Sequence, residues 1–383
     1  MNFFRVFRAF RGQKKILSLG SFSPRSQRLS GSQILQVLQA MLIRPLNLNA
    51  QNDRLKWDRY VLDHPDGSAY QLTAWQAAVE RAYGFSCFYF LAEDGGAIQG
   101  ILPLVEHSVP LLGKSLISLP YCDAGGVLAN DERTTEALLK HVQVFSSERG
   151  SKLKVHSYHP LPLPDNGNSN KVRMLLDLPE NAEQLMAGLK SKVRSQARKP
   201  QRDGLTAKLG GAELCESFYR VFSRNMRDLG SPVHSRQWIE TIVREYGEKA
   251  RLCVVHTPDG EAAAAGLILL HSRTVSIPWA SSLRRYNPLN PNMHLYWTFL
   301  SFAADHGYER FDFGRSTPGE GTYRFKVQWG AEPHPLYWYD ASEQKTKNDS
   351  LSRKREIAAA VWSRLPLTSA TFLGARLRKY ISL

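Results

Sequence analysis

The chain has few of the residues that build disulfide frameworks and zinc sites. Only four cysteines occur among 383 residues, and they lie far apart, at Cys87, Cys122, Cys215 and Cys253. None forms a CxxC pair, and no Cys/His cluster has the spacing of metal ligands. We therefore expect no metal and no disulfide scaffold, and a reducing compartment.

Long apolar runs are also missing, since no stretch approaches the ~20 residues of a spanning helix. The composition, 43% hydrophobic and 22% charged, indicates a globular protein. A chain of 383 residues is too long for one small core, so two domains of ordinary size are expected.

Acidic residues are scarce at both ends of the chain. Residues 1–45 have eight Arg or Lys and no acid, and residues 341–383 have nine bases against three acids. The ends therefore hold almost all of the net charge of +15, and the body between them is nearly neutral. A nearly neutral body argues against a basic face for duplex DNA.

Both ends combine basic with apolar residues. Phe3, Phe7 and Phe10 recur about once per helical turn with arginines between them, as in a helix lying on an anionic membrane. The alternative is an upstream extension with the true start at Met41. Pro366 is expected to divide the C-terminal tail into two short helices. We expect a cytoplasmic protein, with peripheral contact at the inner face of the plasma membrane as the role of the tails.

The first half alternates helices and strands. Two apolar runs separated by Asp94-Gly95-Gly96 predict a hairpin. The Pro-, Asn- and Gly-rich stretch 160–170 is the candidate domain boundary. The expected elements are a helix at 69–84, strands at 87–93 and 97–107, a helix at 134–149 and a strand at 152–158.

The second half repeats this rhythm, which indicates duplication of one α+β unit. We therefore divide the chain into a basic extension 1–40, domains at 41–170 and 171–340, and a basic tail 341–383. The expected elements are helices at 182–205, 213–230 and 235–247, strands at 250–258, 262–272 and 274–283, a helix at 293–306, a strand at 311–313 and a strand-like aromatic run around Lys326.

Three segments resemble a known family: "SRNMRDLGSPVHS" (223–235), "SSLRRYNPLNPNMHLYW" (281–297) and "FDFGRSTPGEGTYRFKVQWGAEPHPLYW" (311–338). Together they resemble FemAB-like proteins of the subgroup associated with PEP-CTERM and exosortase systems. The resemblance covers residues 41–340 and excludes both tails. It implies an α+β fold of two tandem GNAT-like domains with mixed sheets, the fold of acyl-CoA N-acyltransferases.

The resemblance also implies a reaction. Fem peptidyltransferases move an aminoacyl group from a charged tRNA to an amine on a cell-wall precursor. For this subgroup we expect amide formation on a lipid-linked envelope or exopolysaccharide precursor. The chain has no GxSxG elbow and no signature of a cysteine nucleophile, which fits direct transfer without a covalent intermediate. The alternatives are an acyl-CoA-dependent N-acyltransferase and a non-catalytic adaptor of an export system.

No bound cofactor is expected, and the co-substrate is aminoacyl-tRNA or acyl-CoA. The loop from Arg315 to Gly321 resembles the R/Q-x-x-G-x-G/A phosphate loop of GNAT enzymes, but it has one residue too many. Glu320 would also direct negative charge at a pyrophosphate. These departures disfavour acyl-CoA as the donor.

Lys326 is the leading catalytic candidate. In Fem transferases a lysine after an aromatic residue lies by the reacting groups, and Lys326 matches that position. Between Tyr323 and Trp329 its ammonium group would be poorly hydrated, which strengthens its field on a developing oxyanion. The alternative is a lysine whose stem packs on the rings with its charge in water. Tyr323 and Arg315 are substrate-binding candidates, and the alternative for Arg315 is a structural ion pair.

Two polar residues open the last expected helix after Pro291. His294 is a candidate for proton transfer because of its intrinsic pKa, and its alternative is a structural histidine. Asn292 is a substrate-binding candidate or a helix N-cap. In the "RNMRDLG" segment Asn225 is a third candidate, and Arg224 and Asp228 are expected to form an ion pair.

The remaining candidates lie in two places. The basic helix with Lys190, Arg194 and Arg198 would bind the phosphates of a precursor or of tRNA, or it is a solvated face. In the segment 118–126 a strand is expected to lead into a glycine-rich corner with Tyr121 and Asp123. The resemblance implies that this half lines the acceptor groove, so both are acceptor-side candidates; a packed corner is the alternative.

Overall fold

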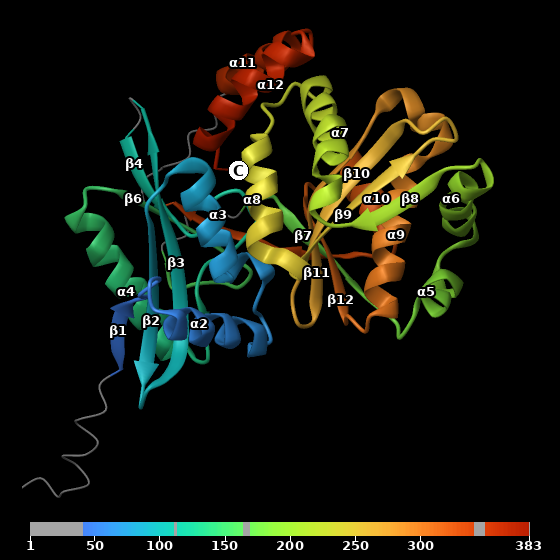
Figure 1. Ribbon diagram of the computed structural model, residues 1–383. Helices are drawn as coiled ribbons and strands as arrows, with labels where there is room; N and C mark the ends of the chain where they lie inside the picture. The colour runs from blue at the N-terminus through green and yellow to red at the C-terminus, as the bar shows by residue number, and fades with distance from the viewer. Residues whose placement is uncertain (1–40, 111–112, 164–168, 341–348, 383) are drawn as a thin grey trace, which may run out of the picture. The chain divides into compact units, whose positions relative to one another are not determined.

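The computed structural model describes residues 41–110, 113–163, 169–340 and 349–382 (Figure 1). Within these residues the strands form two seven-stranded sheets. Each sheet contains one parallel pair, β4 with β6 and β11 with β12, among antiparallel pairs. The expected α+β class with mixed sheets is therefore confirmed. The prediction for the N-terminal arm falls on residues 1–40, outside the described part of the chain.

The first sheet has the order β1-β2-β3-β4-β6-β14, with β5 paired to β3. Its expected β2–β3 hairpin is present, and Gly95 and Gly96 take positive φ angles at the turn, where a side chain would be strained. The elements of this half are β1 (Leu42–Pro45), α2 (Gln51–Asp63), η1 (Ala69–Gln71), α3 (Thr73–Tyr83), β2 (Cys87–Asp94), β3 (Ala97–Val109), β4 (Gly113–Ile117), β5 (Leu128–Ala129), α4 (Glu132–Glu148) and β6 (Lys152–Ser157).

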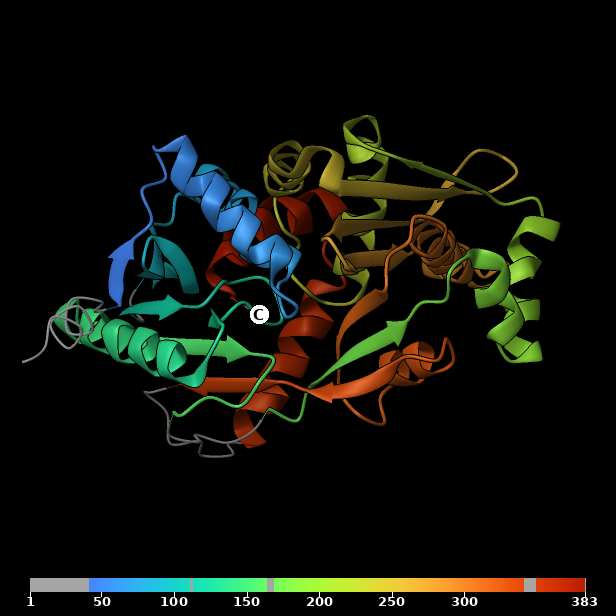
Figure 2. The same ribbon diagram turned by 90° about the horizontal axis from the view of Figure 1, so that it is seen from below.

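The second sheet has the order β13-β7-β12-β11-β10-β9-β8. Seen from below, its strands lie beside α9 and α10, with α5 and α6 at the outer end (Figure 2). Its elements are β7 (Val172–Asp177), α5 (Ala182–Gly188), α6 (Ser191–Arg202), β8 (Thr206–Gly210), η2 (Ala212–Leu214), α7 (Cys215–Asp228), α8 (Arg236–Tyr246), η3 (Gly247–Lys249), β9 (Ala250–His256), β10 (Ala262–Leu270), β11 (Thr274–Ser282), η4 (Arg284–Leu289), α9 (Pro291–Asp305), β12 (Arg310–Ser316), α10 (Gly321–Val327) and β13 (Glu332–Pro335).

The two sheets are joined at the expected boundary and again near the end of the body. β6 of the first sheet ends at Ser157 and β7 of the second begins at Val172. The chain then returns, because β14 (Tyr337–Asp340) pairs antiparallel with β6. The last strand inside the range 171–340 therefore completes the first sheet.

Aromatic side chains pack the two halves into one core. Trp75 and Tyr83 on α3 contact Trp238 on α8, with ring centroids 5.4 and 4.9 Å apart. All three are buried in a cluster that continues to Trp279 of β11. This core fixes the relative position of the elements on which the site is built.

The tail forms α11 (Asp349–Trp362), α12 (Leu367–Leu377) and the short helix η5 (Arg378–Tyr380), and Pro366 separates α11 from α12 as expected. Gly374 lets α12 pack closely against the loop before α8, because a Cβ at this position would lie 2.8 Å from the nitrogen of Val233. Figure 1 shows α11 and α12 above α7. Among the described residues, no helix is both long enough and apolar enough to cross a bilayer.

Three local predictions were wrong. The helix expected over 182–205 is two helices, because Leu189 takes an extended backbone and is buried between them. The run around Lys326 is helix α10, where Phe325 and Trp329 contact each other one turn apart. The segment 118–126 does not open with a strand, because β4 ends at Ile117 and positive φ angles at Leu119 and Tyr121 interrupt the extended backbone.

Candidate active site

A cavity of about 340 Å³ lies where β12 and α10 face the corner that follows β4. Its wall combines residues from the first half, the second half and the C-terminal tail. Tyr70, Phe222, Trp279, Tyr296 and Phe313 supply apolar surface. The polar residues on the wall include Tyr121, Asp123, His234, Arg315, Lys326 and Arg378.

Lys326 reaches this cavity from α10, with a side chain that is buried. Its ammonium nitrogen donates to the backbone oxygens of Gly314, at 3.1 Å, and Arg315, at 2.7 Å. Burial lowers its pKa to about 8, and the nearby Asp123 and Asp312 oppose that shift. Because an ammonium group has three N–H donors, two carbonyl bonds leave one donor for a ligand.

Asp123 is placed by the strained corner after β4. Leu119 and Tyr121 have φ angles of 60° and 70°, which L residues rarely adopt. The Asp123 carboxylate accepts a hydrogen bond from the Arg315 N–H at 2.8 Å and lies 3.5 Å from the Arg315 Nε. Burial raises the pKa of Asp123. Both expected acceptor-side residues therefore lie on the cavity wall.

Gly314 makes this geometry possible. Its φ is 70°, and a Cβ there would lie 3.1 Å from Asp123 Oδ2. Its N–H donates to Asp312 Oδ1 at 2.8 Å. Asp312 is in turn bonded at 2.8 Å by Arg173, whose guanidinium lies over the Tyr158 ring. The β12 corner that carries Arg315 is thus fixed from beneath by a buried ion pair.

His234 and Arg378 are polar wall residues that were not predicted from the sequence. His234 lies in the loop before α8, with Nδ1 2.6 Å from the Tyr83 hydroxyl and Nε2 buried without a partner. Burial lowers its pKa well below the usual range, so the ring is neutral. Arg378 comes from η5, in the tail that the resemblance excluded. The one signal for His234 in the sequence was its place in "SPVHS", at the end of a segment that carries the family resemblance.

Four predicted residues lie away from the wall. His294 is buried in α9, where its Nδ1 has no partner and burial lowers its pKa. Asn292 is the second residue of α9 and not its N-cap, which is Asn290. The Asn225 amide donates to Ser281 Oγ at 3.0 Å. Tyr323 is on α10, but its neighbour Thr322 lines the cavity instead.

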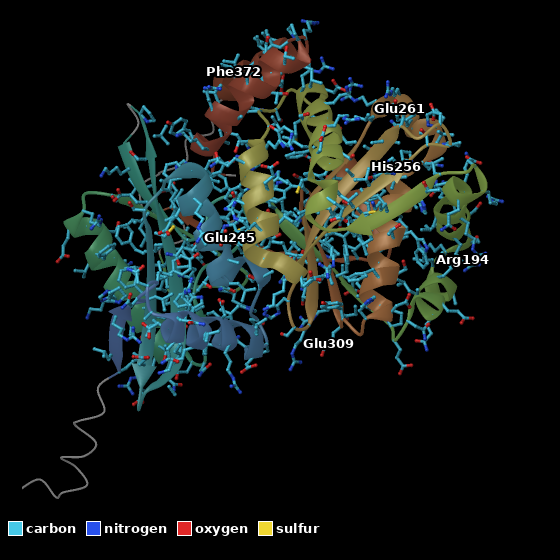
Figure 3. The ribbon with its side chains drawn as sticks, in the orientation of Figure 1. Arg194, Glu245, His256, Glu261, Glu309 and Phe372 are labelled. Atoms are coloured by element: carbon cyan, nitrogen blue, oxygen red, sulfur yellow. The ribbon has the colours of Figure 1, made fainter. Side chains whose placement is uncertain are left out.

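The basic helix α6 is also separate from the cavity. Lys190 is exposed, while Arg194 and Arg198 border another hollow with Trp297 of α9. Figure 3 shows Arg194 at the outer end of the second half. The expected Arg224–Asp228 pair is not formed, because Asp228 binds its neighbour Arg227 at 2.6 Å. Among the described residues, no three His, Cys, Asp or Glu side chains converge as metal ligands.

Residues 188–327 match the family model of the acetyltransferase (GNAT) domain. The chain carries a GNAT acyltransferase domain. This domain includes β12, the corner at Gly314 and Lys326, and thus one side of the cavity. No curated protein sequence matches the chain.

Solved structures extend the likeness to both halves. The crystal structure of FemX matches with a TM-score of 0.62 and 15% identity, over 82% of this chain and 99% of that one. The C-terminal domain of a putative lysylphosphatidylglycerol synthetase from Agrobacterium fabrum matches with a TM-score of 0.51 and 13% identity, over 80% and 96%. At these identities the likeness shows the fold. The expected tandem GNAT-like fold and the acyltransferase class are confirmed.

Proposed function

We propose that the protein transfers an aminoacyl group directly to an amine of an envelope or exopolysaccharide precursor, using the cavity between its halves. One observation carries this proposal: Lys326 is buried at the cavity with its ammonium held by two backbone carbonyls. Such a cation is oriented before the substrate arrives, as electrostatic stabilisation of an oxyanion requires. The resemblance to the exosortase-associated subgroup supports the choice of acceptor.

In the proposed reaction the amine lone pair attacks the carbonyl carbon of the donor ester. Negative charge develops on the carbonyl oxygen, where the remaining Lys326 N–H stabilises it. The intermediate then expels the alcohol of the donor, which takes up a proton, while the new amide nitrogen loses one. Asp123 is the carboxylate on the wall that would accept the proton from the amide nitrogen. Its raised pKa makes it a stronger base than an ordinary carboxylate.

The donor is aminoacyl-tRNA in this proposal. The similarity to FemX, and to the C-terminal domain of a putative lysylphosphatidylglycerol synthetase, supports it. Acyl-CoA is the second candidate, because the matching family model is that of an acetyltransferase. The extra residue in the Arg315–Gly321 loop favours the first donor over the second.

We further propose peripheral contact with an anionic membrane. Six large apolar side chains of the tail are exposed, and they lie among Arg364, Arg376 and Lys379. Figure 3 shows Phe372 on the outside of α12. Apolar surface interleaved with cations suits an anionic lipid surface, and a position at the inner face of the plasma membrane would bring the cavity to a lipid-linked acceptor.

A donor screen tests the proposed reaction. The full chain is incubated with cell extract and either isotope-labelled aminoacyl-tRNA or labelled acyl-CoA, and mass spectrometry follows label into the lipid-linked and polysaccharide fractions. We expect label from aminoacyl-tRNA, lost in Lys326→Met and retained in the control Lys140→Met, which changes an exposed lysine on α4. Label from acyl-CoA would replace the donor, and transfer that survives in Lys326→Met would overturn the role of Lys326.

A further inference from the structure

The cavity wall carries more positive charge than its own acids balance. Arg315, Lys326 and Arg378 face it, whereas Asp123 is the one carboxylate among the described residues on the wall. His234 adds no charge, since burial keeps its ring neutral. Buried charges are normally paired, so this excess points to an anionic ligand.

Arg378 is the unbalanced member of this group. Its guanidinium is held by a bond to the backbone oxygen of Ile381, and no carboxylate of the described residues lies within ion-pair distance. Burial lowers its pKa, and the charge of Arg315 lowers it further. Arg315 itself has a buried Nη1 without a hydrogen-bond partner. Two guanidinium groups that line one cavity thus have donors without a partner among the described residues.

The tail holds Arg378 in this position through its backbone. The oxygen of Lys379 accepts from the Tyr121 hydroxyl at 2.5 Å and lies 2.8 Å from His107 Nε2. The Tyr121 N–H donates to the oxygen of Ser382 at 2.7 Å. These bonds connect η5 to the strained corner that also carries Asp123. The tail is therefore built into the wall.

We propose that Arg378 and Arg315 bind a phosphate group of the acceptor substrate, so that the C-terminal tail completes the active site. Guanidinium groups present paired donors that match phosphate oxygens. A doubly charged group offsets the excess of two positive charges on the wall, which a single carboxylate does not. The inference rests on the proposed function, because it assigns that substrate an anionic group within reach of Lys326.

Calorimetric titration of the full chain with inorganic pyrophosphate and with acetate, at one ionic strength, tests this site. We expect pyrophosphate to bind more tightly than acetate and Arg378→Gln to weaken it by about tenfold or more, the loss of a charged hydrogen bond. Arg376→Gln is the matched control, since Arg376 is exposed on the preceding helix α12, over the Phe372 ring. Its effect is expected to stay below about twofold.

A second variant separates charge from docking. Arg378→Lys keeps the charge and should retain more affinity than Arg378→Gln, while hydrogen exchange at the Tyr121 N–H reports whether the tail is still docked. The proposal would be overturned if pyrophosphate did not bind, or if acetate bound as tightly as pyrophosphate. It would also be overturned if Arg378→Gln lost no more affinity than Arg378→Lys, or no more than Arg376→Gln. Pyrophosphate binding without label transfer from any donor would instead reject the proposed reaction and leave this site standing.

Discussion

Lys326 is held by dipoles, since its hydrogen bonds go to the backbone oxygens of Gly314 and Arg315 and not to a carboxylate. A paired ammonium would have its field neutralised by its partner. Here Asp123 and Asp312 act on it only at longer range, while burial dominates its pKa. The residue therefore keeps a charge that it can offer to a reacting oxygen.

The pH dependence of transfer should report this charge. With a pKa of about 8, Lys326 is protonated below that pH and loses its proton above it. The ratio of wild-type to Lys326→Arg transfer rates is expected to fall as pH rises through about 8, because a guanidinium stays charged in this range. The protonation of the acceptor amine changes both rates by the same factor, so it cancels in the ratio. A ratio that rises with pH would mean that Lys326 acts as a base.

The Arg173–Asp312 pair beneath the site should be important for stability. Both side chains are largely buried, with 14% and 3% exposed. Asp312→Asn is expected to destabilise the fold by about 3–5 kcal/mol, because it leaves a buried guanidinium unpaired. Urea unfolding measures the change. In the exposed pair of Arg59 and Asp63, Asp63→Asn should leave the midpoint unchanged, and equal effects at both sites would reject the argument.

At the scale of elements, the β12–α10 corner brings Arg315 and Lys326 together. Gly314 and Gly319 both take positive φ angles there, of 70° and 83°. They differ in surroundings, since a Cβ on Gly314 would press on Asp123 Oδ2 and a Cβ on Gly319 would meet nothing within 4 Å.

This pair yields a matched test. Both Gly314→Ala and Gly319→Ala should destabilise the fold by roughly 1–2 kcal/mol through backbone strain. Only Gly314→Ala should also lower transfer, because it displaces the Asp123 carboxylate. The measurements are thermal unfolding and initial rates. Equal rates in the two variants would show that the position of Asp123 does not matter to the reaction.

The tail helices make a separate prediction at this scale. Phe372, Leu373 and Leu377 on α12 are 58%, 42% and 46% exposed. Their joint replacement by serine should weaken binding to phosphatidylglycerol vesicles in a sedimentation assay, since apolar area and charge act together at the interface. Leu55→Ser on α2, at a side chain 60% exposed, is the control. Undiminished binding by the α12 variant would exclude this surface as the contact.

At the scale of the whole body, residues 41–340, the halves share one buried core. Trp75, Tyr83 and Trp238 pack across them, and β14 returns to the first sheet. We therefore expect one cooperative unfolding transition, with coincident tryptophan fluorescence and far-ultraviolet circular dichroism. Two separated transitions would mean that the halves are independent domains.

Local signals in the sequence were enough for most elements. The Asp94-Gly95-Gly96 turn predicted the β2–β3 hairpin because glycines permit positive φ, and Pro366 predicted the division of the tail because proline removes a helix hydrogen bond. The prediction was wrong around Lys326, where a short run of alternating aromatic residues fits a strand or a helix equally well. Only packing of Phe325 and Trp329 on neighbouring elements decides between them.

The sequence by itself determined the α+β class, the resemblance to Fem-like proteins and the placing of Lys326, Arg315, Tyr121 and Asp123 among the candidates, because each depends on local patterns or motifs. It did not determine which candidates meet. Asp123 reaches Arg315 across 192 positions of the chain, and Arg378 enters the wall through backbone bonds to Tyr121, which no motif records. Such encounters come from long-range packing, so only the tertiary structure excluded His294 from the cavity wall and added Arg378 to it.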